Sequence, residues 1–168
     1  MDEIRLIERL EQPTVGVRQV VRSDGLPDVF ARAVPAVAQI LPRLGAVPAG
    51  APYARYRGPL SEAVDVEVGF PVVEPVPDDA VGSVTVPGGE LRADHLPAVR
   101  AVEAVHAGSY EELATTYARM EDWVAEHQLA LLDQSWEIYE AGPESDPDPA
   151  TWRTRIVLPV TGPAVGAG

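Results

Sequence analysis

The sequence contains no cysteine and no lysine, and each absence removes a class of chemistry. Without cysteine there is no disulfide, no thiolate metal ligand and no thiol nucleophile. Without lysine there is no Schiff-base catalysis and no lysine for a phosphate-binding P-loop. The 168 residues include 13 arginines against 26 aspartates and glutamates, which gives a formal net charge of −13. Because such a chain repels phosphate backbones, we expect no direct contact with nucleic acid.

Long apolar runs and metal-ligand patterns are missing too. No apolar stretch reaches the roughly 18 residues of a membrane span, and the acidic N-terminus, MDEIRLIERLEQ, has no signal-peptide pattern. The three histidines, His95, His106 and His127, have no i, i+4 spacing, and neither HExxH nor GxSxG occurs. We therefore expect a soluble, cytoplasmic protein that has no metal, no cofactor and no membrane partner.

What the sequence does contain is a repeated order of strand, helix, strand and strand. In the first half we predict a strand at 15–23, a helix within 24–50, and strands at 52–58 and 63–74. Pro35 and Pro42 should kink or shorten this helix. Its apolar residues at helical spacing are Phe30, Val34, Val37 and Leu41. In the last of these strands, Asp65 and Glu67 face away from the alternating valines.

A turn-rich linker at 75–97 separates this half from the second. We expect it to carry a short hairpin around Ser83–Val86 and Leu91–His95. The second half is predicted to form a strand at 98–108, a helix at 109–128, and strands at 132–142 and 152–160. Ser109 is the expected N-cap of this helix. Its apolar stripe contains Leu113, Tyr117, Met120 and Val124.

These elements predict an α+β fold built from a tandem βαββ repeat. Both helices would pack on one face of a curved antiparallel sheet, and the other face would curve around a central ligand cleft. We expect a single domain over residues 1–160, with pseudo-repeats at 13–76 and 97–160 and a flexible tail at 161–168. The hydrophobic fraction of 46% is typical of a globular chain.

A glutamate in the middle of one predicted strand is the first candidate for function. Alternation places Glu137 and Tyr139 on one face, and Trp136 and Ile138 on the face that we expect to meet the helix. A carboxylate so placed is costly unless something pairs with it. Arg155 on the neighbouring strand would make a salt bridge. The alternative is a pocket carboxylate that awaits a cationic or proton-accepting ligand.

Several motifs together resemble the GyrI-like effector-binding family. They are HAGSYEEL (106–113), WEIYEAG and TWRTRIVLPV in the second half, with PYARYRG and VDVEVGFPVVE in the first. The resemblance covers residues 13 to 160. It implies a tandem βαββ fold, which this family uses as the drug-sensing domain of MerR- and AraC-type regulators and in stand-alone proteins.

The resemblance also implies a ligand site. Glu137 and Tyr139 match the family's strand glutamate and tyrosine, which lie in the ligand cleft, and Tyr110 matches the tyrosine of HxGxY. Tyr56, with Tyr53 as a second candidate, matches the aromatic of the first-half strand. Trp123 or Trp152 would add flat walls for an aromatic cation, and Glu67 or Asp65 would reinforce the negative charge. Burial of Glu137 should raise its pKa, and a cationic ligand should lower it again.

Three functions remain open at this stage. The first is binding of lipophilic, aromatic, often cationic compounds, in sensing or sequestration. Because the sequence has no helix-turn-helix segment, a sensor would need a separate protein partner. The second, from the resemblance, is a hydrolase that opens the cyclopropane of DNA-alkylating natural products, with Glu137 as general base and Tyr110 or Tyr139 as proton donor. The third is an inhibitor-type module that docks on a basic protein.

Overall fold

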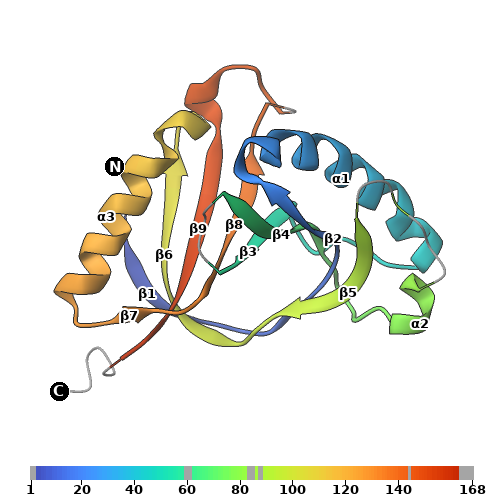
Figure 1. Ribbon diagram of the computed structural model, residues 1–168, viewed down its shortest axis with the longest axis horizontal. Coiled ribbons are helices and arrows are strands. Elements are labelled where there is room, and N and C mark those ends of the chain that lie inside the picture. The colour runs from blue at the N-terminus through green and yellow to red at the C-terminus, as the bar shows by residue number, and fades with distance from the viewer. Residues whose placement is uncertain (1–2, 59–61, 83–85, 87–88, 144, 163–168) are drawn as a thin grey trace. The chain divides into compact units, whose positions relative to one another are not determined.

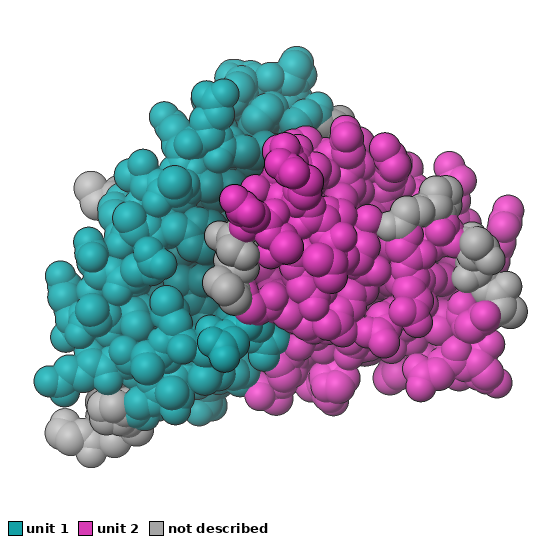
Figure 2. Space-filling view, viewed as in Figure 1, with its two compact units in different colours: residues 1–9, 99–168 teal, residues 10–98 magenta. Residues whose placement is uncertain are grey.

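The structure, a computed structural model, describes residues 3–58, 62–82, 86, 89–143 and 145–162. The chain divides into two compact units (Figure 2). Unit 1 comprises residues 1–9 and 99–168, and unit 2 comprises residues 10–98. Most of the tail predicted at 161–168 lies outside the described residues, as does Ser83 of the expected hairpin. Within the described part of the chain, no helix is both long and apolar enough to cross a membrane.

Unit 2 is an antiparallel sheet of four strands in the order β3-β4-β2-β5 (Figure 1). Its elements are β2 (Gln12–Arg22), α1 (Leu26–Ile40), β3 (Tyr53–Arg57), β4 (Ala63–Pro71), α2 (Asp78–Val81) and β5 (Glu90–Leu96), with 3-10 helices at Ser23–Gly25 and Leu41–Leu44. The long helix α1 packs on β2 and β4. This is the strand, helix, strand, strand order predicted for the first half of the sequence.

Helix α1 differs from the prediction in its buried face. The buried side chains are Val29, Ala33, Val37 and Ile40, whereas Phe30 and Val34 are only half-buried. The helix continues through Pro35, because this residue lies on the exposed side, where water can satisfy the backbone carbonyl that loses its partner. It ends before Pro42, which belongs to the following 3-10 turn. Gly45, at a φ of +66°, closes that turn.

Unit 1 has the strand order β1-β6-β9-β8, with the short β7 paired to β9. Its elements are β1 (Arg5–Arg9), β6 (Val99–Ala107), α3 (Leu113–Glu126), β7 (Ala130–Leu131), β8 (Gln134–Ala141) and β9 (Arg153–Thr161), with 3-10 helices at Tyr110–Glu112 and Pro149–Thr151. The α+β fold class predicted from the sequence is confirmed. The ligand cleft expected with it stays a prediction.

An apolar core lies between α3 and the sheet of unit 1. Its buried members are Val102, Ala104, Met120, Val124, Leu129, Ile156, Leu158 and Val160. Leu113 and Tyr117 of the predicted stripe pack against it while staying partly exposed, and Thr116 is buried instead. Ser109 occupies the N-cap position of the 3-10 turn that leads into α3, as predicted, but its side chain makes no capping hydrogen bond.

The strand that leads into each repeat pairs with the first strand of the other repeat. β1 comes directly before β2 in the chain but pairs with β6, and β5 comes directly before β6 but pairs with β2. Leu91–His95, expected to be half of a hairpin, is therefore a strand that pairs with β2. This exchange is the reason why residues 1–9 belong to unit 1.

Candidate functional site

Glu137 is buried in unit 1 and is held by two tyrosine hydroxyl groups. Only 6% of the surface of Glu137 is exposed to solvent. The Tyr117 hydroxyl donates a hydrogen bond to Oε2 of the carboxylate, and the Tyr139 hydroxyl donates one of 2.8 Å to Oε1. Tyr117 comes from α3 and Tyr139 from β8. The carboxylate is thus bonded from both the helix and its own strand.

The face of β8 that meets α3 is the reverse of the one predicted. Glu137 lies opposite Ile156, a member of the core beneath α3, so Glu137 faces the helix. Trp136, opposite Val157, points to the other side of the sheet, and so does Ile138. The prediction failed because both faces of this strand are largely buried, so apolar character alone does not show which one the helix covers.

The salt bridge considered between Glu137 and Arg155 is absent from the structure. Arg155 lies opposite Ile138, on the face away from α3. Its Nε donates a 2.8 Å hydrogen bond to Glu140, and its Nη1 donates to Glu103. Glu137 therefore has tyrosine hydroxyls, rather than a guanidinium group, as its partners.

Burial raises the pKa of the Glu137 carboxyl above its ordinary value. The hydrogen bonds from Tyr117 and Tyr139 and the nearby His106 oppose this rise without cancelling it. The cause is the cost of placing a negative charge where water cannot reach it. Such a carboxyl gains from any ligand that supplies positive charge or takes up a proton.

His106 of β6 lies near this carboxyl and contacts both the turn before α3 and α3 itself. It is 3% exposed; its Nε2 lies 2.9 Å from the Ser109 carbonyl oxygen and its Nδ1 lies 2.7 Å from the Thr116 hydroxyl. Because a carbonyl oxygen only accepts, Nε2 must carry a proton and donate to Ser109. This arrangement fixes the backbone next to Tyr110.

An aromatic cluster, defined as Tyr110, Tyr139 and Trp152, adjoins Glu137. The ring centroids of Tyr110 and Trp152 are 5.1 Å apart at an interplanar angle of 31°, and Tyr139 meets Tyr110 edge to face at 6.1 Å. Tyr110 is 39% exposed, so the cluster reaches the surface. Tyr139 belongs to both groups, because its ring contacts Tyr110 while its hydroxyl binds Glu137.

Comparison with known protein families identifies the family of this chain. The model of the GyrI-like small molecule binding domain matches residues 2–161. The chain belongs to the GyrI-like family. A search of the curated proteins finds no match.

Solved structures that resemble this GyrI-like chain share its fold at low sequence identity. The C-terminal domain of EcmrR has a TM-score of 0.76 and 22% identity, with 97% of this chain and 99% of that one covered. A hydrolase from Listeria innocua has a TM-score of 0.67 and 15% identity, with coverages of 95% and 92%. SAV2435 bound to tetraphenylphosphonium has a TM-score of 0.65 and 10% identity, with coverages of 95% and 94%.

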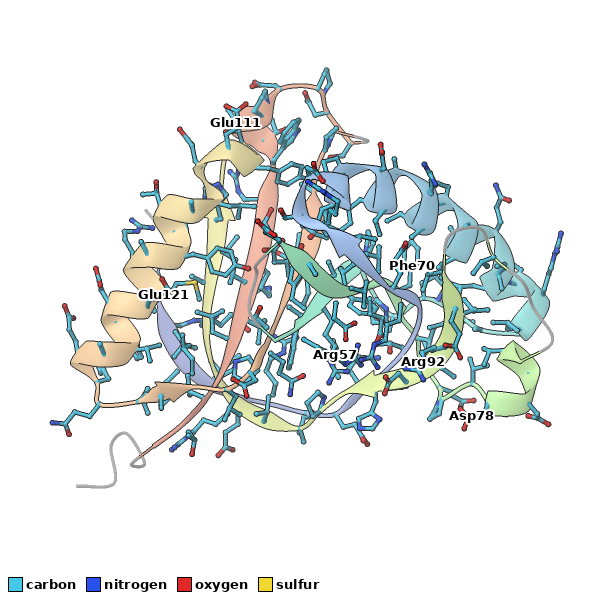
Figure 3. The ribbon with its side chains drawn as sticks, viewed as in Figure 1. Arg57, Phe70, Asp78, Arg92, Glu111 and Glu121 are labelled. Atoms are coloured by element: carbon cyan, nitrogen blue, oxygen red, sulfur yellow. The ribbon has the colours of Figure 1, made fainter. Side chains whose placement is uncertain are left out.

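The other predicted site residues lie elsewhere in the structure of this GyrI-like protein. Trp123, near the end of α3, stacks on His127 with centroids 3.6 Å apart. In unit 2, the Tyr53 hydroxyl donates to Glu67, which also forms a 2.9 Å ion pair with Arg57. The side chain of Arg57 is labelled in Figure 3. Glu67 is therefore already neutralised by an arginine.

Tyr56 and Asp65 have structural partners of their own in unit 2. Tyr56 lies opposite Val66, so it points to the other face of β3 from Tyr53. Asp65 accepts two hydrogen bonds from Arg18, of 3.0 and 2.7 Å, and that hydrogen bonding lowers its pKa. The position of Tyr56 is explained by packing in the sheet, and that of Asp65 by its hydrogen bonds with Arg18.

Tyr117, His106 and Thr116 are the site residues that the sequence interpretation missed. Tyr117 was assigned to the core, although it follows Tyr110 by seven residues, a spacing that places two helical side chains on the same side. His106 was recognised as the first residue of the HAGSYEEL motif and was set aside as a metal or triad histidine, without a structural role. Among the described residues, no group of three or more histidines and carboxylates could hold a metal ion.

Proposed function

We propose that this GyrI-like protein binds lipophilic aromatic compounds, often cationic, through Glu137 and the aromatic cluster, in drug sensing or sequestration. One observation carries the proposal. Glu137 is a buried carboxyl with a raised pKa, and tyrosine hydroxyl groups, rather than a cationic side chain, hold it. A cation near this carboxylate would remove the cost of its charge.

The cluster supplies the rest of the recognition. Tyr110 and Trp152 offer ring faces to an aromatic ligand, and their electron-rich faces attract cations. Tyr139 stands between Tyr110 and Glu137. We infer that a ligand reaches the carboxylate when the Tyr139 hydroxyl leaves it, so that Tyr139 opens the site and Tyr117 keeps Glu137 in place.

The experiment is a tryptophan-fluorescence titration with tetraphenylphosphonium and with neutral triphenylphosphine oxide. In Glu137→Gln, tetraphenylphosphonium should bind about tenfold more weakly, which corresponds to about 1.4 kcal/mol, whereas triphenylphosphine oxide should change little. Glu140→Gln is the matched control, since it makes the same change on the exposed side of the same strand. Unchanged affinity in Glu137→Gln, or an equal loss in Glu140→Gln, would reject the proposal.

Hydrolysis is the second candidate, because the same carboxyl has the properties of a general base beside hydroxyl donors. Water would attack a cyclopropane carbon as Glu137 takes its proton. The ring bond would break, its electron pair would pass to the conjugated dienone, and a tyrosine, Tyr139 or Tyr110, would protonate the dienone oxygen to give a phenol. The tyrosinate would then regain its proton from Glu137, so that the net reaction is addition of water.

Product analysis separates the two candidates. A hydrolase converts a cyclopropane electrophile to its hydrated phenol, whereas Glu137→Gln retains binding and loses turnover. If the wild-type protein binds the electrophile and forms no product above the buffer rate, the binding function stands alone.

A further inference from the structure

A second polar group lies in unit 1, on the face of the sheet away from α3. Its centre is Glu103, which is 3% exposed and lies between Val102 and Ala104 of the helix-covered core. Alternation along β6 therefore directs Glu103 to the opposite face. Glu137, which faces α3, and Glu103 belong to different sides of the same sheet.

Three arginines surround this one buried carboxylate. Arg9 donates a 2.6 Å hydrogen bond to Glu103, Arg155 donates another, and a guanidinium nitrogen of Arg5 lies 3.6 Å away. Arg5 is the least engaged of the three, since it is the farthest away and its side chain is 55% exposed. The three guanidinium groups therefore have more N–H donors than the carboxylate of Glu103 can accept.

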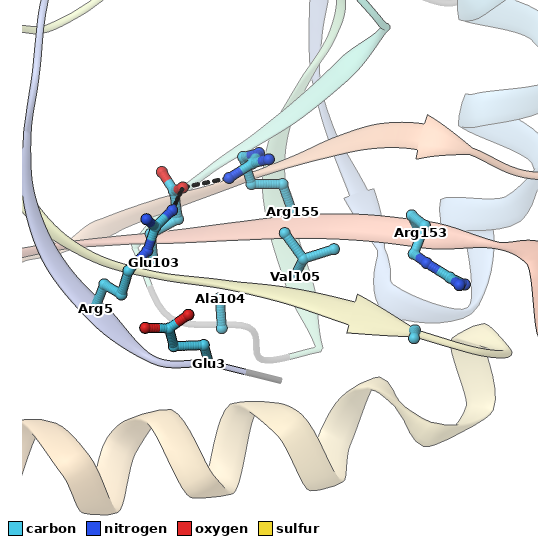
Figure 4. Close-up of a pocket in the computed structure, with 8 residues that line it drawn as sticks. Glu3, Arg5, Glu103, Ala104, Val105, Arg153 and Arg155 are labelled. Carbon is cyan, nitrogen blue, oxygen red and sulfur yellow. Dashed lines mark hydrogen bonds and ion pairs between the residues drawn. The ribbon is translucent and has the colours of Figure 1, made fainter. Parts of the chain in front are cut away.

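A cavity of about 440 Å³ opens beside this group. Figure 4 shows Arg5, Glu103, Arg153 and Arg155 around it, with Val105 among them. Val105 lies opposite Arg155 in the sheet. The lining thus alternates guanidinium groups with small apolar side chains.

Arg153 lines the same cavity, and its guanidinium group donates to main-chain oxygens. Its Nη1 donates to two backbone carbonyl oxygens, of Ala150 at 3.0 Å and of Trp152 at 2.8 Å. No carboxylate in the described part of the chain pairs with it. The opposing residue, Ala107, is exposed and small, so the space next to Arg153 is open.

The charge at this cavity contrasts with that of the whole chain. The protein has a net charge of −13. Around the cavity, four arginines (Arg5, Arg9, Arg153 and Arg155) gather against three glutamates (Glu3, Glu103 and Glu140). The local balance is one positive charge, so an anionic ligand would meet attraction here rather than the repulsion expected over the rest of the chain.

We propose that this cavity binds an amphipathic organic carboxylate. The carboxylate would lie against the free donors of Arg153, with Arg155 next to it, because a planar guanidinium group matches a carboxylate in geometry and charge. The apolar part would cover Val105 and Ala107. This site is independent of the one proposed at Glu137, and it takes ligands of the opposite charge.

The test is calorimetric titration of the whole protein with 1-naphthoate and with the neutral 1-naphthamide. Naphthoate should bind at one saturable site, and naphthamide at least tenfold more weakly. Arg153→Gln should weaken naphthoate at least tenfold. Ala107→Glu, which places a carboxylate beside Arg153 at an exposed position, should abolish binding without lowering the melting temperature.

Two controls keep this test separate from the site at Glu137. Arg43→Gln removes one exposed arginine of unit 2, and Glu137→Gln alters the other site; both should bind naphthoate as the wild type does. The proposal is overturned if naphthoate gives no saturable heat, if naphthamide binds equally well, or if Arg153→Gln and Ala107→Glu leave the affinity unchanged.

Discussion

Tyr117 donates its hydroxyl hydrogen to the carboxylate of Glu137 and so joins the middle of α3 to the middle of β8. This one contact affects both the packing of α3 on the sheet and the charge of the Glu137 carboxyl. The hydrogen bond lowers the cost of a buried carboxyl beneath the helix, together with the one from Tyr139.

Tyr117→Phe should destabilise the protein by about 1 kcal/mol, the usual contribution of such a hydrogen bond. It should also raise the pKa of Glu137 further, because a bond that favours the charged carboxylate is lost. Urea unfolding and NMR titration of the Glu137 carboxyl measure the two effects. Thr115→Val, on the exposed side of α3, is the control. An unchanged pKa in Tyr117→Phe would contradict this account of the contact.

Glu137 should make stability fall as the pH rises. Because its pKa is higher in the folded protein than in the unfolded chain, the folded state holds the proton more tightly between these two values. The stabilisation is fully present below the unfolded pKa and is lost as the pH rises through the folded pKa. Asp65, with a lowered pKa, acts in the opposite direction.

The difference between wild type and Glu137→Gln isolates this effect, since Asp65 is common to both. Unfolding free energies should be measured by urea denaturation at a series of pH values. As the pH rises from the unfolded to the folded pKa of Glu137, the stability of Glu137→Gln should increase relative to that of the wild type. A difference that does not depend on pH would mean that Glu137 has an ordinary pKa.

His106→Ala should cost about 2–3 kcal/mol and disturb Tyr110. The substitution leaves the buried Thr116 hydroxyl and the Ser109 carbonyl without the ring that they contact. Since Tyr110 follows Ser109 and contacts Trp152, tryptophan emission should change along with stability. His95→Ala, which alters an exposed histidine of unit 2, serves for comparison. A loss of stability with no change of emission at Trp152 would separate His106 from the aromatic cluster.

Arg57→Met should destabilise unit 2 by about 3–5 kcal/mol, because it removes the cation from a fully buried carboxylate. The double variant Arg57→Met, Glu67→Gln should recover part of that loss, since the uncompensated charge is then gone. Thermal and urea unfolding of both variants measure the coupling. Equal stabilities of the single and double variants would show that the charge is not the cause.

Much of the fold could be predicted from local patterns in the sequence. The alternating strands, the helix of the second repeat and the burial of Glu137 followed from spacing and hydrophobicity. The direction of Glu137 did not, because alternation assigns residues to two faces without saying which face a helix will cover. The contact from Tyr117 depends on how α3 lies over β8, which no local pattern records. In the same way, nothing in Glu67 itself showed that Arg57 would neutralise it.

The exchange of leading strands means that unit 1 is not one continuous piece of chain. A fragment of residues 99–168 would lack β1, and with it Arg5 and Arg9, two of the three cations around Glu103. The outer edge of β6 would also lose its hydrogen-bonding partner and invite pairing with other molecules. A fragment of residues 10–98 retains β2, β3, β4 and β5 but carries a stretch at its C-terminal end that normally leads into β6. Cutting the chain between residues 98 and 99 therefore separates β1 from β6, the strand with which it pairs, whereas β2, β3, β4 and β5 stay on one piece.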